Sequence, residues 1–208
     1  MIGLIDSTPD PNPDIALRNM FAARKEVFVD LLGWDVPVLD GRFELDQFDD
    51  EHARYLVLVD RDMRHLGSAR LLPTVRSHIL NTLFPSLCAG PVPSGPAVFE
   101  ITRFCLDRSL TAAERRGVRN RLVTALVEHA LATGIATYTG VAEFSWMRQI
   151  LAFGWDAAAL GQPLPGGGGA LGALRIEITT MTAQQLAATG VWQPTERLSD
   201  AFAISSKA

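Results

Sequence analysis

The chain has 208 residues, of which 48% are apolar and 20% are charged, with 19 basic and 23 acidic side chains. This composition is typical of a globular protein with one sizeable core. A net charge of −4 is too small to indicate binding to nucleic acid or to a membrane surface. No apolar run approaches the roughly 18 residues of a membrane span, and the start of the chain lacks a signal-peptide pattern. We therefore predict one cytoplasmic domain over residues 1–208, with a turn-rich leader at 1–13 and a loose tail from about 190 to 208.

Apolar residues recur every three or four positions from Asp14 to Leu31, and this spacing predicts a helix that Gly33 ends. Residues 34–51 are polar and contain Pro37 and Gly41, so we expect a loop there. The next run, Arg54-Tyr-Leu-Val-Leu-Val59, is typical of a central strand. Its expected hairpin partner covers residues 66–72, after a turn at 60–64.

In the second half, the capping-box sequence Thr111-Ala-Ala-Glu114 predicts the start of a long helix that runs to about Thr133. The other expected elements are a short helix at 78–84, a loop at 90–96, strands at 98–106, 135–142 and 174–180, and a helix at 144–153. The order αβββαβαβ predicts an α/β (α+β) fold with a mixed, mostly antiparallel sheet flanked by helices.

The segment Gly41–Glu51 holds five acids in eleven positions, among them Glu44, Asp46 and Asp49. The segment could be a loop exposed to solvent. It does not fit an EF-hand calcium site, because it lacks the glycine that the turn of such a site requires. Carboxylates with a nearby aromatic face, such as Trp34, would also suit a cationic small molecule. Arg70 lies in an apolar strand, where it either faces solvent or pairs with these acids or with a ligand carboxylate.

The strand Val98-Phe-Glu-Ile-Thr-Arg-Phe104 contains a glutamate among apolar residues. Such a residue is rare without a partner, and burial makes a carboxylate more ready to accept a proton. By alternation, Glu100 and Arg103 point to opposite faces, so a shared site requires an irregularity between them. A structural Glu–Arg pair is the alternative.

Six arginines fall between residues 103 and 121, and the segment Glu114–Arg119 opens a helix directly after a strand. Backbone N–H groups and arginines in such a place suit a pyrophosphate or phosphopantetheine, although a solvated helix face is equally compatible. The four histidines and two cysteines lack metal-ligand spacing, and no G-x-S-x-G elbow occurs, so we expect no metal and no enzyme nucleophile. We expect Cys88 and Cys105 to be free thiols and Gly166–Gly169 to be a flexible loop.

These residues resemble the bacterial acyl-homoserine-lactone synthases, the autoinducer synthases of quorum sensing. The resemblance covers about residues 15–180. It rests on the motifs Glu-x-Asp-Gln-Phe-Asp at 44–49, Gly-x-x-Arg-Leu-x-Pro-Thr at 67–74 and Glu-x-x-Arg-Phe at 100–104. It implies a fold related to the GNAT acyltransferases and two substrates, S-adenosylmethionine and an acyl chain on acyl carrier protein or coenzyme A. It also implies that the reaction releases 5′-methylthioadenosine and uses no cofactor.

The resemblance implies roles for individual residues. We expect Glu100 to accept the proton of the attacking amine, with Arg70 and Arg103 in the same catalytic region. The expected S-adenosylmethionine residues are Arg24, Phe28, Trp34, Asp46, Asp49, Phe84 and Arg103. The candidates for the acyl pocket are Phe104, Val141, Phe144, Met147 and Ile150. The candidates for docking the carrier are Arg108, Arg115, Arg116 and Arg119.

Two departures from the family pattern affect the substrate. The glycine run at 166–169 is unfamiliar. Residues 139–142 are Thr-Gly-Val-Ala, with no threonine at the positions that align with those the family links to 3-oxo chains, and this favours an acyl group without that substituent. Two other functions compete with the synthase. One is a GNAT-type N-acyltransferase that uses acyl-CoA and another amine, and the other is a non-catalytic small-molecule sensor on the same scaffold.

Overall fold

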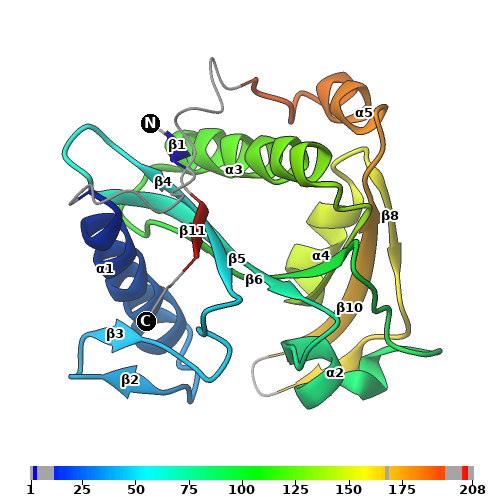
Figure 1. The fold of residues 1–208 in the computed structure, drawn as a ribbon, viewed down its shortest axis with the longest axis horizontal. Helices are drawn as coiled ribbons and strands as arrows, with labels where there is room; N and C mark the ends of the chain where they lie inside the picture. The colour runs from blue at the N-terminus through cyan, green and yellow to red at the C-terminus, as the bar shows by residue number, and fades with distance from the viewer. Residues whose placement is uncertain (1, 4–11, 167–168, 195–202, 206–208) are drawn as a thin grey trace. The chain divides into compact units, whose positions relative to one another are not determined.

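The computed structural model describes residues 2–3, 12–166, 169–194 and 203–205 (Figure 1). The chain divides into two compact units, one of residues 1–71, 103–125 and 194–208 and the other of residues 72–102 and 126–193. A single domain therefore stays a prediction. Most of the predicted leader and tail, and the centre of the predicted glycine loop, lie outside the described residues.

The first unit contains a largely antiparallel sheet. Strand β4 (Arg54–Val59) pairs with β5 (His65–Pro73), and this confirms the predicted hairpin. Tyr55 is in register with Arg70, and Leu58 with Gly67. The end of β6 (Val98–Leu106) also belongs to this unit. Two short strands, β1 (Ile2–Gly3) and β11 (Ala203–Ser205), pair with β4.

Helices pack against both faces of β4 and β5, which explains why β4 is apolar along most of its length. Helix α1 (Asn12–Arg24) lies on the face that carries Tyr55, whose ring contacts Phe21 edge-on at 5.8 Å. Helix α3 (Ala112–Thr133) covers the other face, where a Cβ at Gly67 would lie 2.8 Å from Cγ1 of Val118. The predicted capping box at the start of α3 is present.

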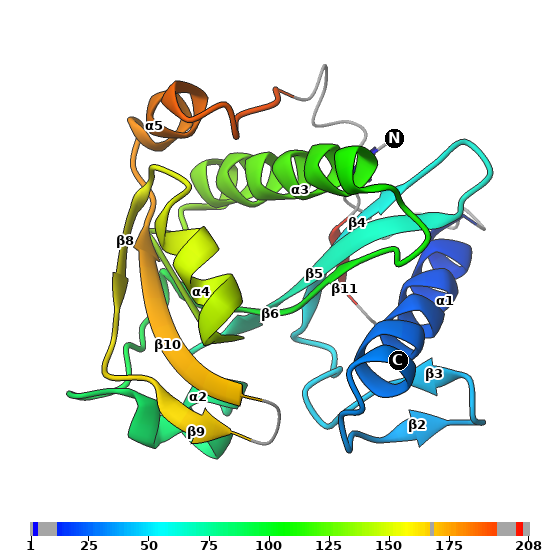
Figure 2. The same cartoon turned by 180° about the vertical axis from the view of Figure 1, so that it is seen from behind.

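The segment between α1 and β4 differs from the prediction in two ways. The predicted first helix changes at Arg24 into a π-helix, Lys25–Leu31. The expected loop contains a small hairpin of β2 (Val38–Leu39) and β3 (Phe43–Glu44). Asp40 and Gly41 both have positive φ in its turn, and Asp-Gly is a common hairpin signal. Figures 1 and 2 show this hairpin beside the end of α1.

The second unit has its own mixed sheet. The first part of β6 pairs in parallel with β7 (Thr137–Glu143), which pairs antiparallel with β10 (Gly169–Glu177). Two further strands, β8 (Asp156–Ala159) and β9 (Leu164–Gly166), pair antiparallel with β10. The strands are mainly antiparallel and flanked by helices, so the predicted α/β (α+β) class is confirmed.

Helices lie on both faces of this second sheet. Helix α2 (Ile79–Leu83) and the 3-10 turn Pro85–Leu87 place Leu80 and Leu87 in one buried cluster with Ala173 of β10. Helix α4 (Phe144–Leu151) covers the opposite face, where Met147 lies against Gly172. The predicted final strand begins at Gly169 rather than 174, and neither β8, β9 nor α5 (Thr182–Ala188) was predicted.

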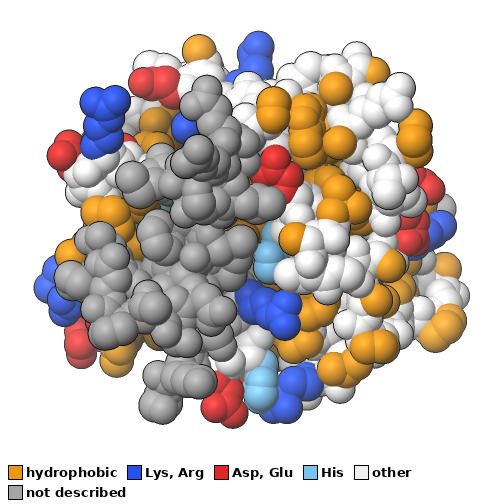
Figure 3. All heavy atoms as spheres, turned by 45° about the horizontal axis from the view of Figure 1, so that its top comes forward, with side chains coloured by type: hydrophobic (Ala, Val, Ile, Leu, Met, Phe, Trp, Pro, Cys, Tyr) orange, Lys and Arg blue, Asp and Glu red, His pale blue; other side chains and the backbone are white. Residues whose placement is uncertain are grey.

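The described residues contain no helix that is both long and apolar enough to cross a bilayer. On the face drawn in Figure 3, charged side chains of both signs are interspersed with apolar ones.

A close backbone approach at Gly161 gives a test of the second unit. A Cβ there would overlap the carbonyl oxygen of Leu87 and lie 2.9 Å from the backbone N of Ala89. We expect Gly161→Ala to lower the free energy of unfolding in urea by about 1–3 kcal/mol. The matched control is Gly117→Ala in α3, where no atom lies within 4 Å of the added methyl group. That change should be neutral or stabilise by about 0.5–1 kcal/mol. Equal effects of the two substitutions would contradict the close approach.

Candidate active site

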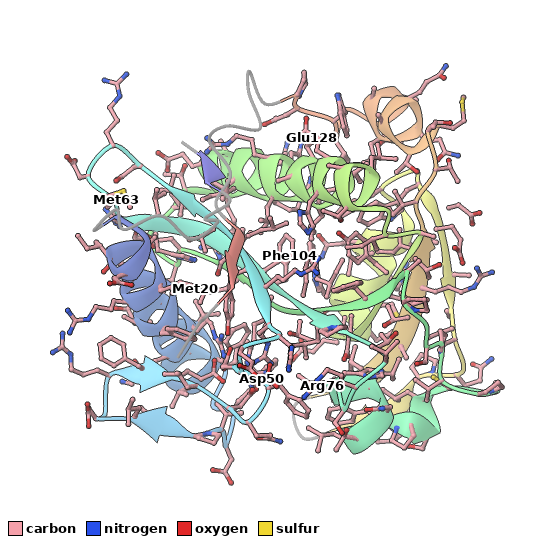
Figure 4. All side chains as sticks on the ribbon, in the orientation of Figure 1. Met20, Asp50, Met63, Arg76, Phe104 and Glu128 are labelled. Carbon is pink, nitrogen blue, oxygen red and sulfur yellow. The ribbon has the colours of Figure 1, made fainter. Side chains whose placement is uncertain are left out.

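Three carboxylates of the first unit come from the last residue of the small hairpin and from the turn that follows it. Glu44 is the last residue of β3 and is fully buried. Asp46 begins a tight turn, in which its side chain accepts the backbone N–H of Phe48 at 2.9 Å and its carbonyl accepts that of Asp49 at 3.0 Å. This turn holds Asp49 against its neighbour, because the Asp49 carboxylate accepts the N–H of Asp46 at 2.9 Å. The turn ends beside Asp50, which Figure 4 labels.

Three arginines come from three different elements. Arg24 is the last residue of α1, Arg70 belongs to β5, and Arg103 belongs to β6. Arg103 has a φ of 49°, which an arginine rarely adopts. This left-handed residue interrupts the regular alternation of β6, as a site containing Arg103 would require. Such strain persists only where the surrounding contacts enforce it.

The six side chains form a closed ring in which charges alternate. Arg24 donates to Glu44 at 2.5 Å and, with two bonds of 2.8 Å, to Asp49. Arg70 forms two bonds to Asp46 at 2.6 and 3.0 Å, and its Nη1 lies 2.8 Å from Asp49. Arg103 closes the ring by donating to Glu44 at 2.8 Å and to Asp46 at 2.7 Å. We call these six residues the ion-pair ring.

The ion-pair ring is almost completely buried, and this sets its electrostatics. The side chains of Arg24 and Glu44 are 1% and 0% exposed, and the most exposed member, Arg103, reaches 8%. Burial by itself lowers the pKa of Arg24, but Asp49 and Glu44 outweigh it and raise the pKa above the usual value. Burial likewise raises the pKa of Asp49, whereas Arg24 and Arg70 lower it well below the usual range. Arg24 and Asp49 therefore both stay charged near neutral pH.

Tyr55 is a further member of this region that the sequence analysis missed. Its hydroxyl donates to Asp49 at 2.8 Å from a side chain that is 1% exposed. Burial, and then the Asp49 charge, raise the pKa of Tyr55, so the phenol keeps its proton. The available signal was the register of a hairpin, because Tyr55 in β4 lies opposite Arg70 in β5.

Two aromatic side chains lie next to the ion-pair ring. Phe28, in the π-helix, stacks on Trp34 with ring centroids 4.7 Å apart, and Trp34 is 37% exposed. The guanidinium carbon of Arg103 lies 5.5 Å from the Phe28 centroid and 5.7 Å from that of Trp34, within cation–π range. The structure thus brings seven predicted residues together: Arg24, Phe28, Trp34, Asp46, Asp49, Arg70 and Arg103.

Glu100 is held inside the second unit. Its side chain is fully buried, and both carboxylate oxygens accept the backbone N–H of Leu80, at 3.0 and 3.2 Å. Helix α2 therefore anchors the carboxylate from the face of the sheet that it covers. Phe84, predicted for the S-adenosylmethionine site, follows α2 and packs on the cluster of Leu80 and Ala173.

The predicted acyl-pocket residues do not form a single group. Val141 packs with Leu80 and Ala173 on the face under α2, whereas Met147 lies against Gly172. Ala173 and Gly172 are successive residues of β10, so the side chain of Ala173 and a Cβ added at Gly172 point to opposite faces. Val141 and Met147 therefore lie on opposite faces of the sheet, and the acyl pocket stays a prediction. Phe144 and Ile150 share α4 with Met147, and Phe104 belongs to β6 (Figure 4).

The predicted docking arginines lie on and just before the start of α3. Arg108 and Arg116 are exposed, and Arg115 donates to the carbonyl oxygen of Arg108 at 3.1 Å. Burial and the neighbouring charge of Arg116 lower the pKa of Arg119, which indicates repulsion between adjacent cations. Arg108 also lines a cavity of about 380 Å³ together with Asn19, Glu26, Asp62 and His65.

The ion-pair ring predicts how stability depends on pH. Because the folded pKa of Asp49 lies below the usual value near 3.9, its contribution is complete above that value and is lost as the pH falls below it. Between pH 5 and pH 2.5, we expect the free energy of unfolding of the wild-type protein in urea to fall by about 2 kcal/mol more than that of Asp49→Asn. The variant should be less stable at pH 6, because it leaves Arg24 and Arg70 with one carboxylate fewer. Parallel pH curves for the two proteins would contradict this assignment.

Comparison with known proteins places this site in a family. The autoinducer synthase family model matches residues 12–186. An acyl-homoserine-lactone synthase of Ralstonia nicotianae is 35% identical over 174 residues, which cover 80% of this chain and 84% of that protein. A solved CoA-dependent acyl-homoserine lactone synthase, MesI, is 29% identical, covers 93% of this chain and 97% of its own, and superposes with a TM-score of 0.81.

A second solved structure carries bound molecules. It is the CoA-dependent synthase BjaI with SAM and isopentyl-CoA, which is 28% identical, covers 96% of each chain and has a TM-score of 0.80. A putative N-acetyltransferase from Lactobacillus plantarum, at 19% identity and a TM-score of 0.57, shares the fold alone. The family model covers most of the chain, and the relative from Ralstonia exceeds 30% identity over four fifths of it. This chain belongs to the autoinducer synthase family.

Proposed function

We propose that this protein acylates the amine of S-adenosylmethionine and releases an acyl-homoserine lactone and 5′-methylthioadenosine. The observation that carries the proposal is the ion-pair ring beside the Phe28–Trp34 pair, inside a chain whose curated relatives are named acyl-homoserine-lactone synthases. In this proposal S-adenosylmethionine is a substrate and no cofactor takes part.

The charges of the ion-pair ring suit a zwitterion rather than a simple cation. Every carboxylate of the ring is already paired with an arginine, so the ring as a whole is neutral. It presents both signs of charge within a few ångströms, as the ammonium and carboxylate of an amino acid require. Arg103 is its most exposed member and lies over both aromatic rings, whose faces attract a sulfonium or stack on an adenine. Asp46 and Arg103 are therefore our candidates for direct contact.

Glu100 is our candidate for the general base. The amine of S-adenosylmethionine is protonated near neutral pH and must lose a proton before it attacks a thioester. Glu100 lies three residues before Arg103 in the sequence. Leu80 holds the carboxylate in one orientation, which a proton acceptor needs. The deprotonated amine bonds to the carbonyl carbon of the thioester, the carbon–sulfur bond breaks, and the sulfur leaves as a thiol with the proton taken from the amine.

Lactone formation needs no enzyme nucleophile. The carboxylate of the substrate attacks its own γ-carbon, the carbon–sulfur bond breaks, and a neutral thioether leaves from the sulfonium. The protein has to bring these two substrate atoms together, and this is catalysis by positioning. The rigidity of the ion-pair ring supports this role, because each charged group is held by two partners.

We propose an acyl thioester of coenzyme A as the donor, with acyl carrier protein as the competing donor. The names of the solved relatives MesI and BjaI support coenzyme A. Both donors are anionic, and Arg108, Arg115, Arg116 and Arg119 offer a cationic surface at the start of α3. Repulsion between Arg116 and Arg119 would be relieved by a bound anion.

The reaction is tested by Glu100→Gln. The amide oxygen can still accept the N–H of Leu80, so α2 should stay in place, but the residue can no longer take a proton. We expect kcat to fall by about 10²–10⁴-fold, with S-adenosylmethionine affinity unchanged by calorimetry. Products are identified by mass spectrometry as lactone and 5′-methylthioadenosine. The control is the same change at Glu51, whose side chain is 67% exposed. Full turnover by Glu100→Gln would exclude it as the base.

The donor surface is tested by reversing two charges, Arg116→Glu with Arg119→Glu. We expect KM for the acyl donor to rise about tenfold at low salt and less at high salt, with KM for S-adenosylmethionine unchanged. The control reverses two exposed arginines elsewhere in the first unit, Arg18 and Arg61, and gives the same net charge. Assays with acyl-CoA and with acyl carrier protein show which donor is used. Equal KM values in both double variants would place the docking surface elsewhere.

A further inference from the structure

A buried hydroxyl next to Glu100 has no assigned role. Thr139, in β7, is fully buried, and its Oγ1 finds no hydrogen-bond partner among the described residues. An unsatisfied buried hydroxyl is costly, because it has lost its bonds to water. Such a group is retained in a strand more readily when it serves a neighbour.

The sheet register identifies that neighbour. Strands β6 and β7 pair in parallel, with Glu100 opposite Thr139. Paired residues on adjacent strands point to the same face, and the strands lie about 4.8 Å apart. Val141 supports this face independently, because it lies two residues further along β7 and packs against the cluster that contains Leu80, whose N–H binds Glu100. Thr139 and Glu100 therefore occupy adjacent positions on the sheet face that α2 covers.

The other neighbour of Thr139 cannot accept its proton. On β10 the residue in register is Arg175, whose guanidinium only donates hydrogen bonds. Arg175 also pairs with Glu177. Of the two register neighbours of Thr139, only Glu100 is an acceptor. A carboxylate offers about four lone-pair positions, so it can accept the hydroxyl in addition to the N–H of Leu80.

We propose that Thr139 is a positioning residue for Glu100. Rotation about χ1 turns its Oγ1–H toward the carboxylate, and the hydroxyl and the N–H of Leu80 then hold the carboxylate from two directions. The carboxylate keeps a lone pair directed at the substrate amine. This inference rests on the proposed role of Glu100 as the base.

The test removes the hydroxyl but keeps the shape of the side chain. Thr139→Val should lower kcat by about tenfold and leave KM for S-adenosylmethionine within about twofold of wild type. Thr139→Ser, which keeps a hydroxyl, should restore kcat to within about threefold of wild type. Thr139→Ala is a second hydroxyl-free variant, and it too should lose kcat if valine packs poorly. Wild-type kcat in both hydroxyl-free variants would overturn the proposal.

A double-mutant cycle separates positioning from a packing effect. If Thr139 acts through Glu100, then adding Thr139→Val to Glu100→Gln should change kcat by less than about twofold. A further tenfold loss in that background would show that Thr139 acts independently and would overturn the inference. The proposed function fails in a different way, since full activity of Glu100→Gln alone would remove the base whatever Thr139 does.

Discussion

The first unit depends on one electrostatic constraint, which is that three buried arginines and three buried carboxylates must be satisfied together. A charge taken out of water is tolerated only when it is paired and hydrogen-bonded. The ion-pair ring meets this requirement by closure, because every member has a partner on each side. Closure also joins the end of α1, the turn after β3, the centre of β5 and the irregular residue of β6. The positions of four elements are thus fixed by one network, and the left-handed φ of Arg103 is compatible with that network because three hydrogen bonds hold its guanidinium.

The sequence was most informative where residue type and spacing act locally. The hairpin of β4 and β5 and the start of α3 follow from alternation and from a capping box, both of which are short-range patterns. The hairpin of β2 and β3 was missed although Asp40-Gly41 is a turn signal, because its strands have two residues each and carry no readable period. The π-helix was missed for another reason. A wider turn keeps residues 25–31 helical, so the apolar spacing does not distinguish it from the preceding α-helix.

For the site, the motifs identified the charged residues but not their partners. From the sequence, the acids of the 41–51 segment could have bound a ligand directly. The structure shows instead that Arg24, Arg70 and Arg103 bind these acids. Which arginine meets which acid depends on contacts between residues 20 to 59 positions apart. The acyl-pocket set shows the same difficulty. Val141 and Met147 are close in sequence, yet they lie on opposite faces of one sheet. Tyr55 carried no motif at all, and only strand register brings it to Asp49.

The closure of the ion-pair ring has a consequence for how such a protein can change over generations. Replacing any one of the six residues leaves two buried neighbours of the opposite charge with one partner fewer each, so single substitutions are expected to be strongly selected against. Tolerated changes in this region would need simultaneous substitution of both members of an ion pair. Positions that covary among relatives should therefore be neighbours in the ion-pair ring. The aromatic pair is under no such reciprocal constraint. We therefore expect substitutions at Phe28 and Trp34 to be tolerated more readily than substitutions among the charged residues beside them.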